Sequence, residues 1–469
     1  MHAVCTDIMN SVGGCVEKLK LSGMGSNLNE NSIDENSPSL IYSIGIITDS
    51  PENPENVTHF SVTTALTYCK TKILKPYLRF LCITGLRSFV ADSSDRFTLK
   101  GCCCHLYIIA LLILIILGYL LQYTACFRRD RGFCYLIIQS ETGTNLLSDE
   151  ERFKTVCEES IIFSYGIPHI LHFFGYAHAF HVFRSSNDDQ LPSLMESVFL
   201  TLTNLSNGFQ SQKKLVRMLW IFVAINILWM ISSLSAVMVM MLDGTIEFKW
   251  INYNDTNIVL ILKLLLVLST LCHDVVQATV ISNYCLQAQL LTNYVRFLKE
   301  KLLQHSVLAM EWMRDMEEFK KLLHFLNAKL SPSVCIFTLL NVSRSITGTL
   351  WLFNLDNVDR TNSHTFWICL INILLWVVLA LSPFIQAARL TNSCYEIRGV
   401  GHELRARPYP VHSLHNDNSR QLDTLMLYSS TLKYKATLFG LSIKLCYIYF
   451  LLTATSLLIL ALGQLHYLK

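Results

Sequence analysis

Seven long apolar runs divide this sequence, and they leave little room for a water-soluble fold. A bilayer core takes about 20 apolar residues per helix, and each run is long enough. Charged residues make up 16% of the chain, against about 25% in soluble domains. The runs are 103–124, 156–182, 217–242, 257–283, 333–355, 365–388 and 442–465. The sequence therefore predicts an all-α membrane protein with seven transmembrane helices.

The placement of Lys and Arg predicts the orientation of these helices. Of the 38 basic residues, 27 lie in one set of alternate loops and 8 in the other. Because cytoplasmic loops carry the excess of Lys and Arg, we expect a cytoplasmic N-terminus and an extracellular C-terminus. The segment FRRDRGF at 127–133 is an exception, since it falls outside despite three arginines. The net charge of +3 argues against a nucleic-acid partner, which needs a clustered basic surface.

Two short signals agree with this orientation. Asn254 begins an Asn-Asp-Thr sequon in a predicted extracellular loop, where it is a candidate for glycosylation. Cys126 and Cys134 flank the FRRDRGF segment, where oxidising conditions permit a disulfide. The protein is thus predicted to reside in the plasma membrane, crossing the lipid bilayer several times.

The segments between and before the spans differ in composition. Residues 284–332 carry apolar side chains at spacings of three and four, first from Leu286 to Leu298 and again from Met313 to Leu323, which indicates amphipathic helices. A further helix is expected at 420–440. The predicted parts are a disordered cytoplasmic tail (1–65), a cytoplasmic helix before the first span (66–102), six spans with a cytoplasmic helical extension at 284–332 (103–388), cytoplasmic anchor helices (389–441) and a last, pore-lining helix (442–469).

Ionisable side chains within a bilayer are costly and mark candidate sites. Arg344 and Asp274 lie at similar depths of the fifth and fourth spans, so we expect them to form an ion pair. Such a pair serves a function or only fixes the packing of two helices, and the sequence favours neither. Lys263 lies near the outer end of its span, where its stem can reach the interface.

Polar and aromatic residues in the outer halves of the spans are candidates for a ligand pocket open to the outside. The candidates are Tyr165, His169, His172, Arg344, Trp351, Asn372 and Trp376. Each one alone also suits ordinary packing. His169, His172, His178 and His181 have a spacing that suits metal ligands on one helix face, but a polar wall facing water is favoured, so no metal or other cofactor is expected.

The last span contains Gln464 among leucines, close to its predicted outer end. An amide in this position suits a pore lining, where it replaces part of an ion's hydration and leucines gate by dewetting. The alternative is a glutamine at the membrane interface. Glycine-rich phosphate loops, HExxH, paired CxxC and GxSxG motifs are missing from the sequence, so an enzyme is not expected.

The sequence resembles the insect gustatory and odorant receptors together with the gustatory receptor-like proteins of other animals. The resemblance rests on the seven spans, on LKPYLRFLCITGLRSF before the first span, on SSTLKYKATLFGL before the last, and on a chain that stops soon after Gln464. The family ends in Thr-Tyr, five apolar residues and Gln-Phe. Here Leu457-Leu458 and Leu465 replace Thr-Tyr and Phe, which is typical of a divergent, receptor-like member.

This resemblance implies a homotetrameric, ligand-gated, nonselective channel for monovalent and divalent cations, opened by a small molecule of unknown class bound among spans two to six. Carried over by position, Gln464 would lie in the narrow region of the pore, with Leu465 and Ala461 as gate residues.

Three other classes compete with the channel. A G-protein-coupled receptor needs the opposite orientation, and this chain contains neither a DRY-like triplet nor an NPxxY-like run. A transporter would favour two related halves, and no internal repeat is apparent. A membrane protein that conducts nothing is the third alternative.

Overall fold

The computed structural model describes most of the chain between residues 66 and 467, and all of these residues belong to one unit, His59–Lys469. The described ranges are 66–87, 99–130, 132–133, 162–185, 190–203, 208–243, 248, 256–304, 308–354, 363–406 and 416–467. Within them the chain is helical apart from two short hairpins and a few connecting residues. The predicted tail, Asn254 and Cys134 lie outside these ranges.

Five helices in the described part are long and apolar enough to cross a membrane, and all five coincide with predicted spans. They are α4 (Leu99–Thr124), α9 (Gly208–Asp243), α10 (Thr256–Leu303), α12 (Ser331–Asn354) and α13 (Ser363–Arg398). The structure supports a multi-pass membrane protein on this basis.

The other two predicted spans also contain helices. Their described parts are not among the helices that are long and apolar enough to cross a membrane. The turn η2 (Ile162–Gly166) leads into α7 (Ile167–Ser185), which carries four histidines and Pro168. The last helix, α16 (Leu445–Tyr467), is apolar from Leu445 to Ala461, the part of it whose side chains are described without a gap. Seven spans, and the sides on which the termini lie, remain predictions.

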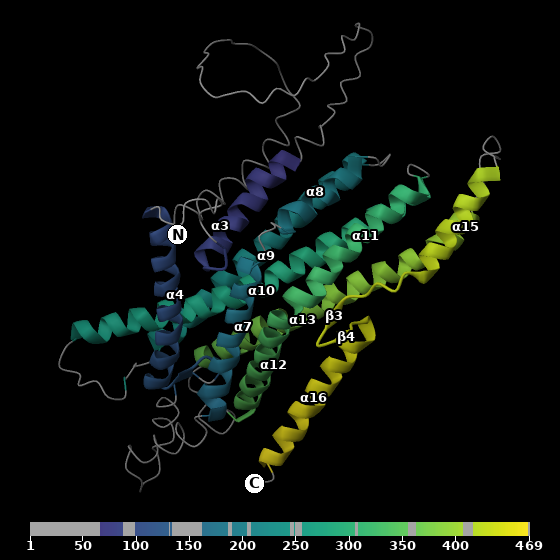
Figure 1. The fold of residues 1–469 in the computed structure, drawn as a ribbon. Coiled ribbons are helices and arrows are strands. Elements are labelled where there is room, and N and C mark those ends of the chain that lie inside the picture. Colours follow the sequence, from purple (N-terminus) through teal and green to yellow (C-terminus); the bar gives the residue numbers. More distant parts are fainter. Residues whose placement is uncertain are drawn as a thin grey trace, which may run out of the picture. The chain divides into compact units, whose positions relative to one another are not determined.

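Helix α10 lies at the centre of the bundle (Figure 1). It contacts α4, α7, α9, α12 and α13 as well as several helices outside the predicted spans. Every residue from Val276 to Thr292 is buried, so this stretch is covered on all sides. A helix that is enclosed all round needs no polar face, yet this one carries buried polar side chains such as Asn283 and Gln287. The helix continues without a break past residue 283, where the sequence predicted the end of a span.

A second group of helices forms where the amphipathic periodicity predicted it. α11 (Ala309–Phe325) continues through η3 (Leu326–Leu330) into α12, and packs with the C-terminal part of α10. Trp312 and Phe319 are fully buried, and the Trp312 indole N–H donates to the Leu298 carbonyl at 3.1 Å. α14 (Val400–Ala406) and α15 (Asn416–Thr431) complete this group. The cytoplasmic location of these helices remains a prediction.

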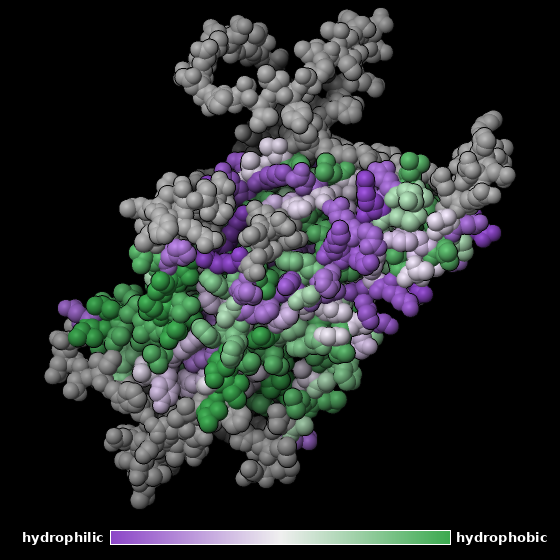
Figure 2. All heavy atoms as spheres, in the orientation of Figure 1, coloured by the Kyte–Doolittle hydropathy of each residue, from purple (hydrophilic) through white to green (hydrophobic). Residues whose placement is uncertain are grey.

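Hydropathy separates the two groups on the visible face. In Figure 2 hydrophilic residues gather over α3 (Lys75–Ile83), α8 (Gln190–Thr203) and α11, while apolar residues gather over α4 and the N-terminal part of α10. The described side chains that are apolar and exposed include Leu106, Leu228 and Leu264, one from each of three candidate spans. An apolar belt of this kind suits lipid contact.

Two local predictions were incomplete or wrong, and one helix was missed. The helix expected at 66–102 is in fact two helical stretches, one ending with α3 at Ile83 and the other beginning with α4 at Leu99. Helix α8 was not predicted, although its Val198 and Phe199 side chains are fully buried. The helix expected at 420–440 ends at Thr431.

A hairpin follows α15 instead, formed by β3 (Thr437–Leu438) and β4 (Leu441–Ser442). Its two turn residues, Phe439 and Gly440, have φ values of 54° and 73°, which is the conformation that a two-residue hairpin turn requires. Side chains from other helices hold its backbone. The hydrogen bonds run from Asn327 to Lys435 O (3.0 Å), from Thr437 N to Asn327 (2.9 Å), from Ser331 to Thr437 O (3.1 Å), and from Ala436 N to Thr391 (3.1 Å).

Candidate functional site

The arginine-rich segment that was an exception to the charge rule folds into the helix bundle. β1 (Phe127–Arg128) pairs antiparallel with β2 (Gly132–Phe133), and Phe127 is 1% exposed within an apolar cluster of α4, α9, α10 and α13. Arg129 and Asp130, at the turn, are 8% and 7% exposed. At least these two charges of the predicted extracellular loop are therefore buried in the protein.

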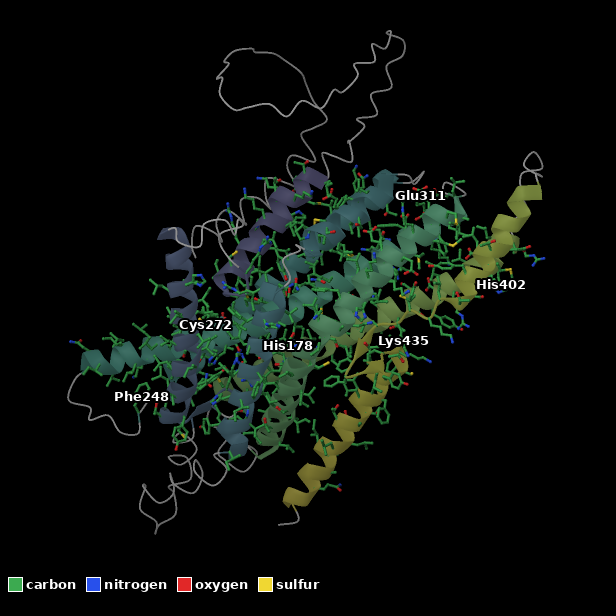
Figure 3. All side chains as sticks on the ribbon, in the orientation of Figure 1. His178, Phe248, Cys272, Glu311, His402 and Lys435 are labelled. Atoms are coloured by element: carbon green, nitrogen blue, oxygen red, sulfur yellow. The ribbon has the colours of Figure 1, made fainter. Side chains whose placement is uncertain are left out.

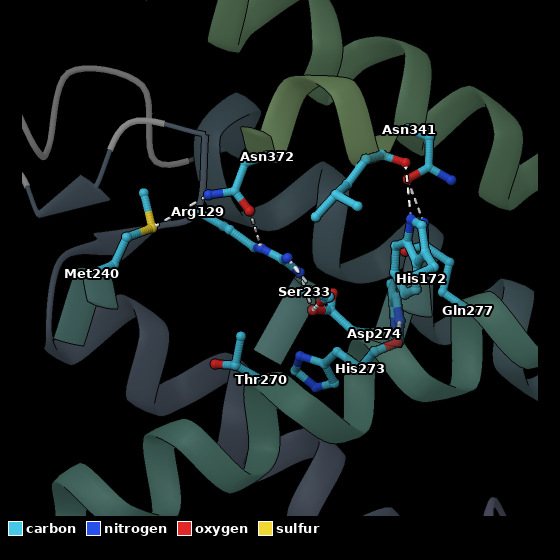
Figure 4. Close-up of polar contacts among 12 residues, drawn as sticks. Arg129, His172, Ser233, Met240, Thr270, His273, Asp274, Gln277, Asn341 and Asn372 are labelled. Atoms are coloured by element: carbon cyan, nitrogen blue, oxygen red, sulfur yellow. Dashed lines mark hydrogen bonds and ion pairs between the residues drawn. The ribbon is translucent and has the colours of Figure 1, made fainter. Parts of the chain in front are cut away.

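Arg129 is the centre of a group that we call the arginine cluster, formed by Arg128, Arg129, Asp130, Ser233, Asp274 and Asn372. Figure 4 shows Arg129 with its partners from the helices. The Arg129 guanidinium pairs with Asp274 on α10 and donates to Asn372 on α13 at 3.0 Å. It also donates to the Ser233 hydroxyl on α9 at 2.8 Å, and lies 5.7 Å from the centroid of the Trp376 ring. One arginine thus joins three candidate spans.

The predicted ion pair between Arg344 and Asp274 was wrong in its partner. Asp274 pairs with Arg129 and accepts a further hydrogen bond from Ser233 at 2.7 Å. The hairpin brings Arg129 to this carboxylate from 145 positions away, a proximity that no local spacing encodes. Arg344 lies nearby, within electrostatic reach of Asp274 and Asp130.

The second acidic residue of the cluster ties the hairpin to α12. Arg128 Nε donates to Asp130 Oδ1 at 3.0 Å, and the Thr347 hydroxyl donates to Asp130 Oδ2 at 2.7 Å. Each aspartate of the cluster is therefore satisfied by an arginine and a hydroxyl.

Next to the arginine cluster lies a second group, the polar cluster, formed by Tyr119, Gln122, His169, His172 and His273. The Tyr119 hydroxyl is 2.7 Å from His172 Nδ1, and its ring stacks on His169 and on His273, each at 4.6 Å between centroids. His169 Nε2 lies 3.0 Å from Gln122 Oε1, and His172 Nε2 lies 3.1 Å from the His273 carbonyl. Since a carbonyl only accepts, these contacts place the proton of each of these two histidines on Nε2.

A glycine allows the two helices that carry this cluster to approach closely. A Cβ atom at Gly118 on α4 would lie 2.7 Å from Ser269 Cβ and 2.9 Å from His273 Cε1 on α10. Contacts this short do not occur between real side chains. The stacking of Tyr119 on His273 thus depends on the absence of a side chain at position 118.

The structure brings four of the predicted pocket residues to these two clusters and packs them against other side chains. His169 and His172 contact Tyr119, while Asn372 and Trp376 contact Arg129. The exposed fractions of His172, Asn372 and Trp376 are 1% each. The Tyr165 hydroxyl lies 3.7 Å from Cys126 Sγ, and Trp351 packs at the edge of the apolar cluster around Phe127. A pocket open to solvent therefore remains a prediction.

Sequence reasoning missed Tyr119, Gln122, Arg129, Ser233 and His273 as members of this site. Tyr119 and Gln122 lie one turn apart in the first span, and nothing in their spacing distinguishes them from packing residues. Arg129 did carry a signal, because three arginines in a predicted extracellular loop conflict with the positive-inside rule.

The remaining site predictions have mixed outcomes. Cys126 is disulfide-bonded, while the pairing with Cys134 remains a prediction because Cys134 lies outside the described ranges, as does Asn254. The four histidines of α7 do not act together: His169 and His172 join the polar cluster, while His178 (Figure 3) leaves its buried Nδ1 without a hydrogen bond in the described structure. Within the described residues no three His, Cys, Asp or Glu side chains are placed to hold a metal ion.

Helix α16 has two different faces. Its Ile448 is buried, and Leu451, Thr455 and Ile459 are partly buried, on the side that contacts α12 and α13. The opposite stripe is exposed and contains Thr453, Ser456, Leu457, Leu460 and Gln464. Ala461 beside it is also exposed, and the Leu465 side chain lies outside the described part of the structure. The three- and four-residue spacings place the stripe on one side of the helix.

Comparison with known proteins gives a likeness in fold. No family model matches the sequence, and the curated proteins contain no match to it. Among solved structures, the insect olfactory receptor OR5 from Machilis hrabei is similar, with a TM-score of 0.58 at 12% identity over 85% of this chain and 99% of that chain. The same receptor in complex with eugenol gives a TM-score of 0.53 at 12% identity, over 85% and 98% of the two chains. At this identity the likeness shows the fold.

Proposed function

We propose that this chain, which has the fold of an insect olfactory receptor, is a chemoreceptor channel of the gustatory receptor-like kind. A small molecule bound among α7, α9, α10, α12 and α13 opens a nonselective pathway for monovalent and divalent cations. The pathway is lined by the α16 helices of four identical subunits in the plasma membrane. The fold and the sequence resemblance support this class of protein, and the faces of α16 support the position of the pore.

The exposed stripe of α16 is the observation that carries the proposal. Four of its members, Thr453, Ser456, Leu460 and Gln464, follow one another at intervals of three or four residues, and all of them face away from the helices of their own subunit. Polar side chains of a membrane helix are costly in lipid and lie at helix interfaces or along water-filled paths. The hydroxyls of Thr453 and Ser456 return hydrogen bonds to carbonyls of the preceding turn, at 3.0 and 2.8 Å.

Gln464 differs from these two residues, because its amide also has an acceptor oxygen, and the N–H groups of a helix interior are already used in backbone hydrogen bonds. At a central axis, four Gln464 amides would replace part of the hydration of a passing cation. Ala461, on the preceding turn, and Leu465, the next residue, would form the gate. Because Ala461 is small, Leu465 supplies most of the constriction.

The arginine and polar clusters are the proposed ligand site. They bring together side chains from five helices and from the β1–β2 hairpin, so a molecule bound there contacts several elements at once. Trp376 and Arg129 lie in contact within this site, and Tyr119 with its histidines supplies a second aromatic surface. The orientation of the chain predicts that this site opens to the extracellular side.

Cysteine crosslinking tests the pore assignment without a known ligand. In a Cys446→Ser background, which removes an exposed native thiol of α16, we would introduce cysteine singly at Ser456 and at Leu460. Thr455 and Ile459, one position earlier on the face toward α12 and α13, provide matched controls. Mild oxidation in membranes should link subunits through the stripe positions and leave the two controls monomeric on a denaturing gel.

Equal crosslinking at all four positions, or none at the stripe positions, would contradict the proposed pore face. A cation flux measurement with the protein in liposomes then tests conduction itself. We expect a thiol-reactive trimethylammonium reagent to reduce cation flux through the Ser456→Cys and Leu460→Cys channels. The Thr455→Cys and Ile459→Cys channels should be unaffected.

A further inference from the structure

Helix α9 carries one continuous exposed stripe that changes from basic to apolar near its N-terminal end. Lys214 and Arg217 are exposed at the start of the stripe. The next members are Ile221, Ile225 and Leu228, which are 53%, 56% and 64% exposed. Spacings of three and four residues place all five on one side of the helix. In the part of the chain that the structure describes, neither basic side chain forms a hydrogen bond or an ion pair.

The length of the apolar part indicates where the basic part lies in a bilayer. The stripe continues from Ile221 to Leu242, and its one polar member, Ser235, bonds within the helix. This part rises about 32 Å, and a hydrocarbon core is about 30 Å thick. Arg217 lies about 6 Å and Lys214 about 10 Å beyond it along the axis. The headgroup layer adds about 5–8 Å on each side, so Arg217 lies among the headgroups and the long stem of Lys214 reaches them.

A second stripe with the same order lies on the helical turn η1 (Cys69–Leu74) and on α3, which continues it. Lys72, Lys75 and Arg79 are exposed at spacings of three and four residues, and Ile83, one turn further, is 46% exposed. None of the three basic side chains is paired with an acidic residue within the described ranges. This stripe therefore also changes from basic to apolar toward one end.

The apolar end of the second stripe lies at the edge of the candidate spans. The Tyr107 hydroxyl of α4 donates to the Ile83 carbonyl, and the exposed apolar face of α4 begins beside it at Leu106, which is 60% exposed. A Cβ at Gly85, which has a φ of 74°, would lie 3.0 Å from Leu111 Cδ2, so the chain after α3 packs on the same helix. At its other end this segment contacts α9 through η1. Figure 2 shows the change from hydrophilic residues over α3 to apolar residues over α4.

We propose that the two stripes together bind the headgroups of anionic phospholipids. We call this surface the basic shelf, and it consists of Lys72, Lys75 and Arg79 on η1 and α3 and of Lys214 and Arg217 on α9. Ammonium and guanidinium groups donate charge-assisted hydrogen bonds to phosphate and carboxylate oxygens, and the apolar residues beyond them contact the acyl chains. The predicted orientation places the shelf in the cytoplasmic leaflet, where anionic lipids are concentrated. The inference requires only that the protein spans a membrane, so it does not depend on the proposed channel.

Phosphatidylserine and phosphatidylcholine with identical acyl chains provide a matched pair of probes, because only the first has a net negative charge. Purified protein in a neutral detergent would be titrated with each lipid, and bound lipid counted by native mass spectrometry. One Lys or Arg near an anionic surface contributes about 5-fold in affinity. With two such residues at one headgroup, phosphatidylserine should bind at least about 10-fold more tightly. Raised ionic strength should reduce this preference, because salt screens exposed charges.

Two double variants test the two stripes separately. Lys214→Gln with Arg217→Gln removes the charges of α9, and Lys75→Gln with Arg79→Gln removes two charges of α3. Each should lower the affinity for phosphatidylserine at least about 5-fold and leave that for phosphatidylcholine unchanged. Because every replaced side chain is exposed, the melting temperature without added lipid should stay the same.

The control is Arg314→Gln with Lys321→Gln, which removes two exposed charges from α11 in the second group of helices and should behave as the wild type. Equal affinity of the wild-type protein for the two lipids would overturn the proposal. So would an equal loss of preference in the α11 control, or an unchanged preference in either variant of the shelf. Inorganic phosphate is the probe for a free anion and should not displace phosphatidylserine. Displacement at equal concentration would mean that a soluble anion occupies the shelf, which also contradicts a lipid site.

Discussion

The pair of Arg129 and Asp274 offers a quantitative test of how the bundle is held together. Both side chains are 7% exposed, so removing either charge leaves the other buried without its partner. Breaking a buried pair in this way costs about 3–5 kcal/mol. We expect Asp274→Asn and Arg129→Gln each to destabilise the protein by about this amount. The double variant removes both charges of this pair, so neither is left buried without its partner, and it should cost less than either single change.

Thermal unfolding in nanodiscs measures this effect. At about 2 °C per kcal/mol, the value for large domains, each single variant should melt about 6–10 °C below the wild type. Lys70→Gln is the control, because it removes an ion pair with Glu196 that has the ordinary length of 3.0 Å but lies on the surface, with side chains 41% and 48% exposed. Such surface pairs contribute about 0–1 kcal/mol.

Two results would refute this reasoning. The first is that the single variants lower the melting temperature no more than Lys70→Gln does, which would mean that water or another group satisfies the remaining charge. The second is that the double variant loses the sum of the two single effects, which would mean that Arg129 and Asp274 act independently. Either outcome would mean that the pair of Arg129 and Asp274 does not hold α9, α10 and α13 together.

Other consequences can be measured on the same preparations. Gly118→Ala should destabilise the protein by about 1–3 kcal/mol, because the new methyl group meets Ser269 at 2.7 Å; an unchanged melting temperature would contradict this close helix contact. Burial raises the pKa of the Cys69 thiol to about 12, so this group stays protonated at pH 8, where the reactive thiolate is needed for alkylation. N-ethylmaleimide should therefore modify exposed Cys446 and leave Cys69 unmodified until the protein is unfolded, whereas equal rates in the folded protein would refute its burial. An epitope added after Lys469 should be detected on intact cells, and detection only after permeabilisation would reverse the predicted topology.

Much of the helical framework was predictable because the membrane imposes a simple pattern. Long apolar runs have few alternatives to helices in a bilayer, and five of the predicted spans coincide with helices that meet the length and hydropathy limits. The periodicity from Leu286 to Leu298 likewise predicted a buried face, and the side chains of Leu290 and Leu298 are fully buried. In the spans local pattern and final environment agree, whereas the stretch up to Thr292 is buried on all sides and not on one face alone.

The hairpin at 437–442 could not be predicted for a different reason. Its turn places Phe439 at positive φ, a position at which Asn or Asp is the usual signal. Asn327 and Ser331 donate hydrogen bonds to its backbone and Thr391 accepts one from it, and these residues are distant in sequence. The apolar spacing of the same segment suits a helix, so tertiary contacts decided its conformation.

Several residues of the candidate site could be predicted from the sequence, but the ion pair that joins them could not. Asp274, Asn372 and Trp376 were identified from polarity within apolar spans, and they do meet at one place. The residue that joins them, Arg129, comes from outside any predicted span. Its approach depends on a reversal of the chain after Cys126, which has a positive φ of 48° and is disulfide-bonded.

The hairpin before α16 also has a mechanical consequence. Hydrogen bonds hold its backbone to η3, α12 and α13. The N-terminal end of α16 therefore has a fixed pivot, and the exposed stripe lies beyond it. The helix has 23 residues, and at 1.5 Å per residue its length is about 35 Å. A rotation of only about 3° at the pivot would therefore move the far end by about 2 Å, more than the radius of a water molecule. Small rearrangements between α12 and α13 are thus multiplied along the helix, and the largest displacement falls near Gln464.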